Sequence, residues 1–290
     1  MPSPKPAPRR PEPADSAPSP AHVALNGVRL ETRWIPGDAA RAPLVFLHEG
    51  LGSVAMWTQR GRDWPAELCA ATGRAGLLYS RRGYGLSDPI PDVRGPQGRH
   101  SARYMHAEAW EVLPRLLAEC GVLPKEKQGF AGPVLIGHSD GATIALLHAS
   151  RFPVSGCVAM APHVMVEAVA LQAIAQARDA YLRSPETHLR EKLQRYHQDP
   201  DNAFWQWNDV WLSAAFATFD IRPECAHVSA PLLLVQGLAD EYGTLAQLDA
   251  IAAAAPQAQR LELADCGHSP HRDQPDALTR AVADFCAALP

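Results

Sequence analysis

Residues 133–150 read PVLIGHSDGATIALLHAS, and few backbone geometries are compatible with that order of residues. A short apolar run is typical of a buried strand, and the run rich in alanine and leucine that ends the segment favours a helix. Between them, Ser139 stands two residues from a glycine on either side. A chain that passes from strand to helix through so short a turn runs close to neighbouring backbone, where only glycine leaves room. The segment therefore predicts a strand, a sharp turn that carries Ser139, and a helix that begins beside it.

The same alternation of strands and helices runs through most of the chain, and it indicates a mostly parallel sheet with helices on both faces. Residues 22–35 alternate around Asn26 and Gly27 and predict an antiparallel hairpin ahead of the parallel strands. Pro114 lies inside one predicted helix and should bend it or cost it a hydrogen bond. The predicted buried strands are 43–50, 76–80, 133–137, 156–162, 231–237 and 259–265, and the predicted helices are 64–71, 101–119, 141–150, 244–254 and 275–289.

The alternation stops between residues 163 and 220, where the sequence is helical and aromatic. A stretch of this length between two strands is too long for a loop, so it predicts a helical lid inserted between two late strands. Trp205 and Trp207 are two residues apart and cannot share one face of a helix, so some aromatic rings should face a cleft. The expected organisation is a disordered proline-rich tail (1–20), a core made of 21–162 and 221–290, and a lid (163–220).

Composition narrows the class of partner. A net charge of −4 gives no basic excess for nucleic acid, and no apolar run approaches the about 20 residues that cross a bilayer. The six cysteines are scattered without a paired spacing, and the first 20 residues contain no apolar leader segment. We therefore expect a cytoplasmic protein with free thiols that binds a small molecule and neither nucleic acid nor a membrane. These features leave open whether it forms a homo-oligomer.

Ser139 has candidate partners further along the chain. A serine hydroxyl is a weak nucleophile at neutral pH and needs a base, which in turn needs an orienting acid. Asp240 follows one late predicted strand within VQGLADEYG, and His268 follows the last predicted strand within ADCGHSPH. Because these loops and the serine turn leave the same edge of a parallel sheet, we expect His268 to take the Ser139 proton and Asp240 to hold the imidazole. Glu241 and His271 are the competing acid and histidine.

Ser139, Asp240 and His268 in this order resemble the α/β-hydrolase superfamily, as does the sequence LHEGLGS at 47–53, where that family usually has H-G-x-P-G. The resemblance extends from residue 21 to the C-terminus and implies the α/β-hydrolase fold. It also implies that the backbone N–H groups of Gly50 and Asp140 form an oxyanion hole. The sequence RRGYGLSDP at 81–89 is similar to the family's R-G-x-G-x-S turn, which is more often structural than catalytic. No metal-binding or nucleotide-binding motif is present, and no cofactor or metal is expected.

Two residues depart from the family pattern. Glu49 stands where the family usually has glycine, and Asp140 follows the serine where a larger neutral residue is common. For Asp140 we expect an acid in the first turn of a helix, where the helix dipole favours negative charge. For Glu49 we expect a hydrogen bond to the neighbouring loop or to Arg81 or Arg82. The alternative is that both carboxylates create a negative field that disfavours anionic substrates.

The resemblance implies a serine hydrolase that cleaves an ester, lactone or similar acyl bond of a small, largely apolar molecule through an acyl-enzyme. The alternatives are a carbon–carbon bond hydrolase, a thioesterase, a cofactor-free perhydrolase, and a non-catalytic ligand-binding member of the fold. Haloalkane dehalogenases and epoxide hydrolases are disfavoured because they carry an aspartate at the position of Ser139. The candidate substrate contacts are His48, Glu49, Trp205, Trp207 and Trp211.

Overall fold

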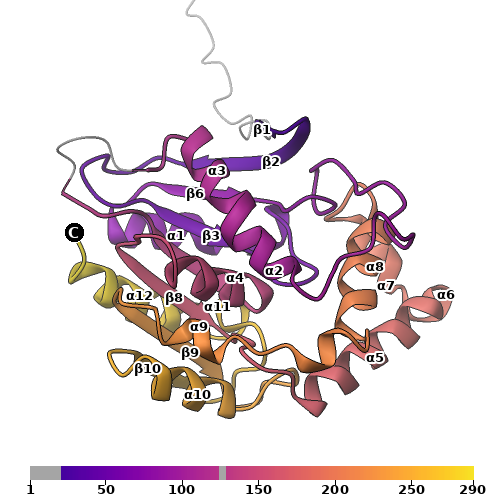
Figure 1. The fold of residues 1–290 in the computed structure, drawn as a ribbon. Coiled ribbons are helices and arrows are strands. Elements are labelled where there is room, and N and C mark those ends of the chain that lie inside the picture. The colour runs from indigo at the N-terminus through magenta and orange to yellow at the C-terminus, as the bar shows by residue number, and fades with distance from the viewer. Residues whose placement is uncertain (1–20, 124–128) are drawn as a thin grey trace, which may run out of the picture.

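A computed structural model of the protein describes residues 21–123 and 129–290, so the predicted disordered tail lies outside the described residues. In the main sheet, the two strand pairs nearest one edge are antiparallel, and every other strand pair is parallel. The predicted mostly parallel sheet is therefore confirmed (Figure 1). Within the described residues, eight strands form this sheet in the spatial order β1 (Ala21–Leu25), β2 (Val28–Ile35), β6 (Gly76–Tyr79), β3 (Leu44–Leu47), β7 (Val134–His138), β8 (Gly156–Met160), β9 (Leu232–Gly237) and β10 (Gln259–Leu263), while β4 (Thr58–Gln59) and β5 (Arg62–Asp63) form a separate ribbon.

The predicted hairpin is formed by β1 and β2. Asn26 and Gly27, the two residues of its turn, have φ angles of 52° and 80°. A two-residue hairpin loop that matches the twist of its strands needs left-handed backbone at both positions, which asparagine and glycine tolerate. The local sequence alone therefore accounts for this connection.

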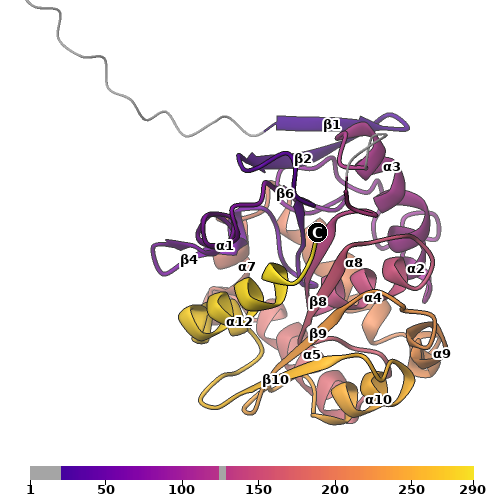
Figure 2. The same ribbon diagram turned by 90° about the vertical axis from the view of Figure 1, so that its left-hand side faces the viewer.

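Helices cover both faces of the sheet, as Figure 2 shows. Successive side chains of a strand point to opposite faces, so a strand covered on both sides is apolar throughout. In β3, Leu44 and Phe46 belong to the core on one face, while Val45 and Leu47 belong to the core on the other. One face is covered by α1 (Trp64–Thr72) and α12 (Pro275–Ala287), and the other by α2 (Tyr104–Ala107), α3 (Leu113–Glu119), α4 (Asp140–Ala149), α9 (Arg222–Cys225) and α10 (Ala246–Ala254).

The predicted helix at 101–119 is divided by a wider turn. A π-helical segment, Glu108–Val112, separates α2 from α3, and Pro114 lies in the first turn of α3. Proline has no N–H to donate to the preceding turn, and a single π turn is a common way to absorb such a break. Trp110 on this segment donates its indole N–H to the carbonyl of Leu147 at 2.8 Å, which fastens the widened turn to α4.

Residues 163–220, called here the helical insertion, join β8 to β9. Their two ends lie together, because the N–H of Ile221 donates to the carbonyl of Val164 at 2.8 Å, and Met165 and Asp220 form a bridge. The insertion thus leaves and rejoins the sheet at one place, and its helices gather beside one end of the sheet (Figure 1). They are α5 (Ala168–Leu182), α6 (Ser184–Thr187), α7 (Leu189–Gln194), α8 (Pro200–Trp211) and a 3₁₀ turn (Phe216–Thr218).

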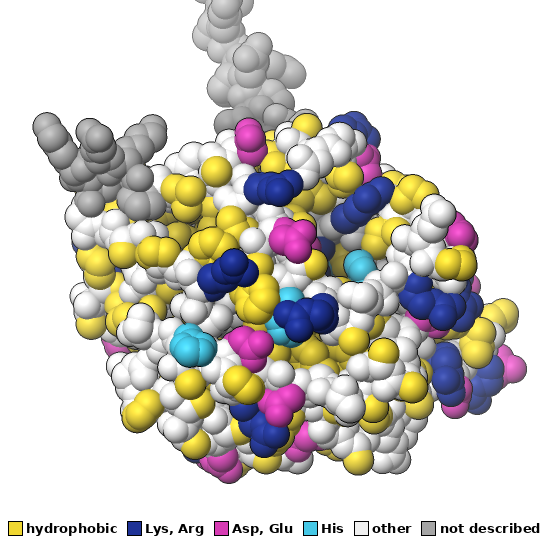
Figure 3. All heavy atoms as spheres, viewed as in Figure 1, with side chains coloured by type: hydrophobic (Ala, Val, Ile, Leu, Met, Phe, Trp, Pro, Cys, Tyr) yellow, Lys and Arg dark blue, Asp and Glu magenta, His cyan; other side chains and the backbone are white. Residues whose placement is uncertain are grey.

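The sequence also raised expectations about membrane-spanning helices, surface charge and the cysteines. None of the helices in the described residues has both the length and the apolar character that spanning a membrane requires. On the face shown in Figure 3, basic and acidic side chains are interspersed. All six cysteines are unpaired, as predicted.

Candidate active site

Ser139 lies in the sharp turn between β7 and α4. Its backbone has φ 54° and ψ −119°, a conformation that residues other than glycine rarely adopt. The turn packs closely against neighbouring backbone. A methyl group added to Gly137 would lie 2.4 Å from the carbonyl oxygen of Gly141. One added to Gly141 would lie 2.0 Å from the carbonyl oxygen of Leu47. Both glycines are therefore required by close backbone approach, as the sequence predicts.

Ser139, His268 and Asp240 form a continuous hydrogen-bonded chain. The Ser139 Oγ lies 2.9 Å from His268 Nε2, and His268 Nδ1 lies 2.9 Å from Asp240 Oδ1. The competing residues are not part of this hydrogen-bonded chain: Glu241 accepts the backbone N–H of His268 at 3.2 Å, and His271 packs against two tryptophan rings. The structure therefore brings together the three residues that the sequence singled out, and it separates them from their competitors.

Asp240 is held in its ionised form by its neighbours. Its side chain is 1% exposed, and this burial alone would raise its pKa. The hydrogen bond and charge of His268, with the backbone N–H of Tyr242 at 2.8 Å, outweigh burial and bring the pKa of Asp240 below its usual value. Gln236 also donates to Asp240 at 2.5 Å. An ionised Asp240 keeps the proton of His268 on Nδ1, which leaves Nε2 free to accept the proton of Ser139.

Asp140 and Gly50, whose backbone N–H groups are the candidate oxyanion hole, line the same cavity as Ser139. Asp140 is the first residue of α4, and neither its N–H nor that of Gly50 has an acceptor within the described residues. Arg81 fixes the direction of the second group, because it donates to the carbonyl oxygens of His48 at 2.6 Å and Glu49 at 2.8 Å. The C=O and N–H of a trans peptide point in opposite directions. With the Glu49 carbonyl held by Arg81, the N–H of Gly50 points away from the guanidinium.

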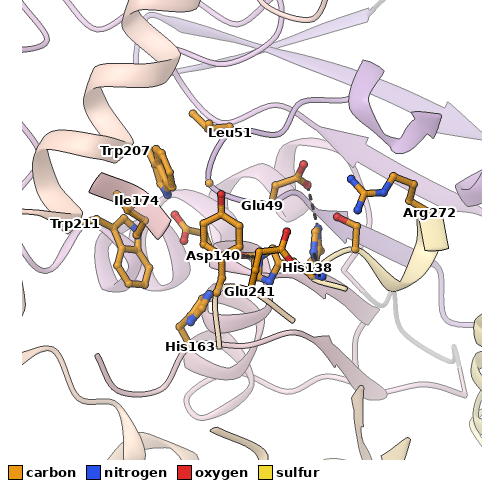
Figure 4. Close-up of a pocket in the computed structure, with 15 residues that line it drawn as sticks. Glu49, Leu51, His138, Asp140, His163, Ile174, Trp207, Trp211, Glu241 and Arg272 are labelled. Atoms are coloured by element: carbon orange, nitrogen blue, oxygen red, sulfur yellow. Dashed lines mark hydrogen bonds and ion pairs between the residues drawn. The ribbon is translucent and has the colours of Figure 1, made fainter. Parts of the chain in front are cut away.

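The side chain of Glu49 pairs with a histidine, so the expected hydrogen bond to an arginine is wrong. Glu49 Oε2 lies 3.1 Å from His138 Nδ1, and His138 Nε2 lies 2.7 Å from the carbonyl oxygen of His268 (Figure 4). A carbonyl oxygen only accepts, so both nitrogens of His138 carry protons when Glu49 is ionised. Burial alone would raise the pKa of Glu49 and lower the pKa of His138, which disfavours the ion pair. The hydrogen bond between the two residues prevails, raising the pKa of His138 and lowering the pKa of Glu49.

Asp140 is also compensated. Its carboxylate accepts the hydroxyl of Tyr104 at 2.5 Å, and the Tyr104 oxygen in turn accepts the indole N–H of Trp211 at 3.1 Å. Burial raises the pKa of Asp140, while the charge of Arg81 and the Tyr104 hydrogen bond oppose that rise. The position in the first turn of α4 agrees with the expected helix-terminal acid. Each of the two unusual acids therefore has a specific partner beside the candidate oxyanion hole.

The cavity in front of Ser139 has a volume of about 210 Å³, below the roughly 300–1,000 Å³ of typical ligand pockets. Trp207 and Trp211 from α8 stand on one side of it, and Arg272 stands on the other (Figure 4). Leu51 and Ile174 complete an apolar wall. The cavity therefore has room for a small molecule with an apolar part.

Two predicted substrate contacts do not line the cavity. His48 is fully buried behind the loop, where its ring bonds the carbonyl of Glu49 at 2.7 Å and accepts the backbone N–H of Arg81 at 3.1 Å. Trp205 lies outside the cavity, under the guanidinium of Arg94 at 3.8 Å. Its position two residues from Trp207 on α8 explains why the two rings face different directions.

Comparison with known proteins agrees with this geometry. The family model described as "Alpha/beta hydrolase family" matches residues 44–281. This chain belongs to the alpha/beta hydrolase family. Among solved structures, the hydrolase is similar to the enol-lactonase from Burkholderia xenovorans LB400, with 21% identity over 92% of this chain and 100% of the other, and a TM-score of 0.64.

Two esterases have the same degree of similarity. A thermophilic esterase from Thermogutta terrifontis has 20% identity and a TM-score of 0.64 over 92% of the hydrolase and 97% of its own chain. An esterase from Rhodococcus has 20% identity and a TM-score of 0.64 over 93% and 98%. At this identity the likeness shows a shared fold, and it confirms the architecture that the sequence predicts.

Several groups at the site of the hydrolase were missed in the sequence. They lie at the ends of strands or in the segments that follow them, and these become neighbours only when the sheet edge forms. The first lies in the serine turn sequence, and two others lie near Asp240 within VQGLADEYG. They are His138, His163, Gln236, Tyr242 and Arg272.

The buried histidines of the hydrolase predict a loss of stability in acid. Burial lowers the pKa of His148 and His197 to about 4 and that of His163 and His271 to about 3. In the unfolded chain they titrate near 6.5, so the unfolded state binds more protons below that pH. The free energy of unfolding should therefore fall as the pH decreases from 6.5 to 4. The raised pKa of His138 opposes this trend, but His138 is a single histidine, whereas the four histidines named above all have lowered pKa values.

Urea unfolding at pH 7.5 and 5.0 measures this effect, which should amount to several kcal/mol at about 1.4 kcal/mol per pH unit and proton. The matched control is His148→Gln, which lies away from the cavity and bonds the carbonyl of Ala109. That variant should show a shallower pH dependence than the wild type. Equal free energies of unfolding at the two pH values would contradict the prediction.

Proposed function

We propose that this hydrolase is a serine hydrolase that cleaves an ester, lactone or similar acyl bond of a small, largely apolar molecule. The observation that carries the proposal is the hydrogen-bonded chain from Ser139 through His268 to Asp240, which begins in a cavity. A nucleophile, a base and an orienting acid within hydrogen-bond reach are what acyl transfer through a covalent intermediate requires.

In the proposed reaction, Ser139 Oγ attacks the substrate carbonyl carbon while its proton passes to His268 Nε2. The carbonyl oxygen becomes negative and is held by the N–H groups of Gly50 and Asp140. The bond between the carbonyl carbon and the alkoxide oxygen then breaks, His268 gives its proton to that oxygen, and the alcohol leaves while the acyl group stays bound to Ser139. Water, deprotonated by His268, attacks the acyl-enzyme, and the acid leaves as Ser139 recovers its proton.

The charges around the cavity support a neutral substrate. Glu49 is balanced by His138, and Asp140 lies beside Tyr104 within the influence of Arg81. Arg272, on the opposite wall, is paired with Asp273 at 2.9 Å. A carboxylate on the substrate would therefore meet no unpaired cation among these residues. Solved enzymes of similar fold that are described as an enol-lactonase and as esterases agree with an acyl bond as the target.

Labelling with a fluorophosphonate tests the proposal. The native protein should be labelled at Ser139, as shown by mass spectrometry of the modified peptide, and heat-denatured protein should not react. A series of p-nitrophenyl esters from acetate to octanoate should then show the highest kcat/KM at short acyl chains, because the cavity is small. A folded protein that is neither labelled nor active on any ester, lactone or thioester would refute the proposal.

A further inference from the structure

The helical insertion places a hydrogen-bond donor beside the candidate oxyanion hole. Trp207 on α8 is 6% exposed and lines the cavity. Its indole Nε1 lies directly against Gly50, because a methyl group added to Gly50 would be 2.2 Å from that nitrogen. Figure 4 shows the Trp207 ring reaching from α8 toward the loop that carries Glu49 and Leu51.

This donor has no partner in the protein. Across residues 21–123 and 129–290, Trp207 Nε1 makes no hydrogen bond, and it is not one of the fully buried polar atoms without a partner, so it keeps access to the cavity that its ring lines. Trp64, Trp110 and Trp211 each donate their indole N–H to an oxygen of the protein, whereas the Trp57 indole nitrogen is buried without a partner. An indole nitrogen can only donate a hydrogen bond. The position therefore suits a ligand that brings an oxygen acceptor to this side of Gly50.

We propose that the indole N–H of Trp207 donates to the same substrate carbonyl oxygen that the N–H groups of Gly50 and Asp140 bind. This inference rests on the proposed acyl-transfer function. Trp207 Nε1 adjoins the Cβ position of Gly50, so the indole N–H and the backbone N–H of Gly50 belong to neighbouring groups on the wall of one cavity. As that oxygen becomes negative, the Trp207 hydrogen bond strengthens, so its contribution is larger in the transition state than in the bound substrate.

The proposal also explains why residue 50 has no side chain. The indole fills the space that a Cβ would take, with its Cδ1 at 2.4 Å from that position as well. Glycine at 50 thus lets the insertion bring Trp207 into contact with the loop. The oxyanion site would then be assembled from three parts of the chain: the loop after β3, the start of α4, and α8.

The experiment compares Trp207→Phe with Trp205→Phe, a matched change on the same helix outside the cavity. Loss of one oxyanion donor costs about 10²–10³-fold in kcat, and we expect the lower end of that range here because two backbone donors remain. Trp207→Phe should lower kcat by about 10²-fold, with KM and the melting temperature close to the wild type. Trp205→Phe should leave kcat unchanged. Fluorophosphonate labelling of both variants at Ser139 would show that the remaining site is intact.

Unchanged kcat in Trp207→Phe, or a change in KM alone, would overturn the inference while leaving the proposed function standing, provided that the wild type is labelled. A wild type that is neither labelled nor active would overturn both. A second measurement does not depend on a folded variant. When a phosphonate on Ser139 places an oxygen in the oxyanion site, the indole N–H resonance of Trp207, assigned by its contact with Gly50, should move downfield. An unmoved resonance would overturn the inference.

Discussion

Replacing Ser139 by alanine is expected to lower kcat for ester hydrolysis by about 10⁴-fold or more. The change removes the atom that attacks the carbonyl and the hydrogen bond to His268 Nε2, and it leaves the backbone donors in place. The residual rate should come from those donors and from substrate binding alone. Single-turnover kinetics with a short p-nitrophenyl ester measures the loss. A variant that keeps more than a few per cent of the wild-type kcat would mean that Ser139 is not the nucleophile.

Ser139→Gly provides the matched control, because it should lose activity to the same extent but gain stability. The backbone at residue 139 has φ 54°, which is strained for serine and alanine and costs of order 1–3 kcal/mol. Glycine adopts this conformation without strain, and its greater freedom in the unfolded chain offsets part of the gain. Urea unfolding should therefore place the free energy of unfolding of Ser139→Gly above that of Ser139→Ala. The reverse order would show that the turn carries little strain.

Replacing Asp240 by asparagine should lower kcat by about 10³–10⁴-fold. The amide of asparagine can donate to His268 Nδ1, which moves the imidazole proton to Nε2. An imidazole protonated on Nε2 cannot accept the proton of Ser139, although the geometry of the site is preserved. The negative charge that stabilises the imidazolium is lost as well. Measurement of kcat on the same ester, with circular dichroism to verify folding, checks this expectation.

Glu241→Gln is the control for Asp240→Asn, because Glu241 is the neighbouring acid in the sequence. The carboxylate of Glu241 accepts the backbone N–H of His268 at 3.2 Å, and in the described residues it makes no hydrogen bond to the imidazole. Its removal should change kcat by less than about 10-fold, in line with loss of one partly exposed hydrogen bond. If Glu241→Gln were more damaging than Asp240→Asn, the two acids would have to exchange roles.

The three central residues could be predicted because each lies just after a strand, and strand ends in a parallel sheet meet at one edge. Their position follows from local patterns and one rule of topology. The pairing of Glu49 with His138 could not be predicted in the same way. It arises because β3 and β7 are neighbours, with Leu47 opposite Gly137, so the loop after β3 meets the end of β7. The order of strands in the sheet is not written in any local pattern of the sequence.

The two predicted contacts that do not line the cavity are absent from it for different physical reasons. His48 follows β3 and seemed near enough to the site, but its ring turns into the core, where both nitrogens find backbone partners. For Trp205 and Trp207, helical spacing shows that the rings diverge without showing which one faces the cavity. That choice depends on how α8 is placed over the sheet edge. The neighbouring loop, Arg81 and Arg82 were the partners expected for the side chain of Glu49. Arg81 binds main-chain carbonyls instead, which composition and spacing do not reveal.

The single point where the helical insertion joins the core has a consequence for how this enzyme could diversify. Because the segment departs and returns between Val164 and Ile221, a segment of another length could replace it without disturbing the order of the strands. Such an exchange would leave the three proposed catalytic side chains untouched and change one wall of the cavity. Within a family that shares this core, new substrates could thus be acquired by swapping one module.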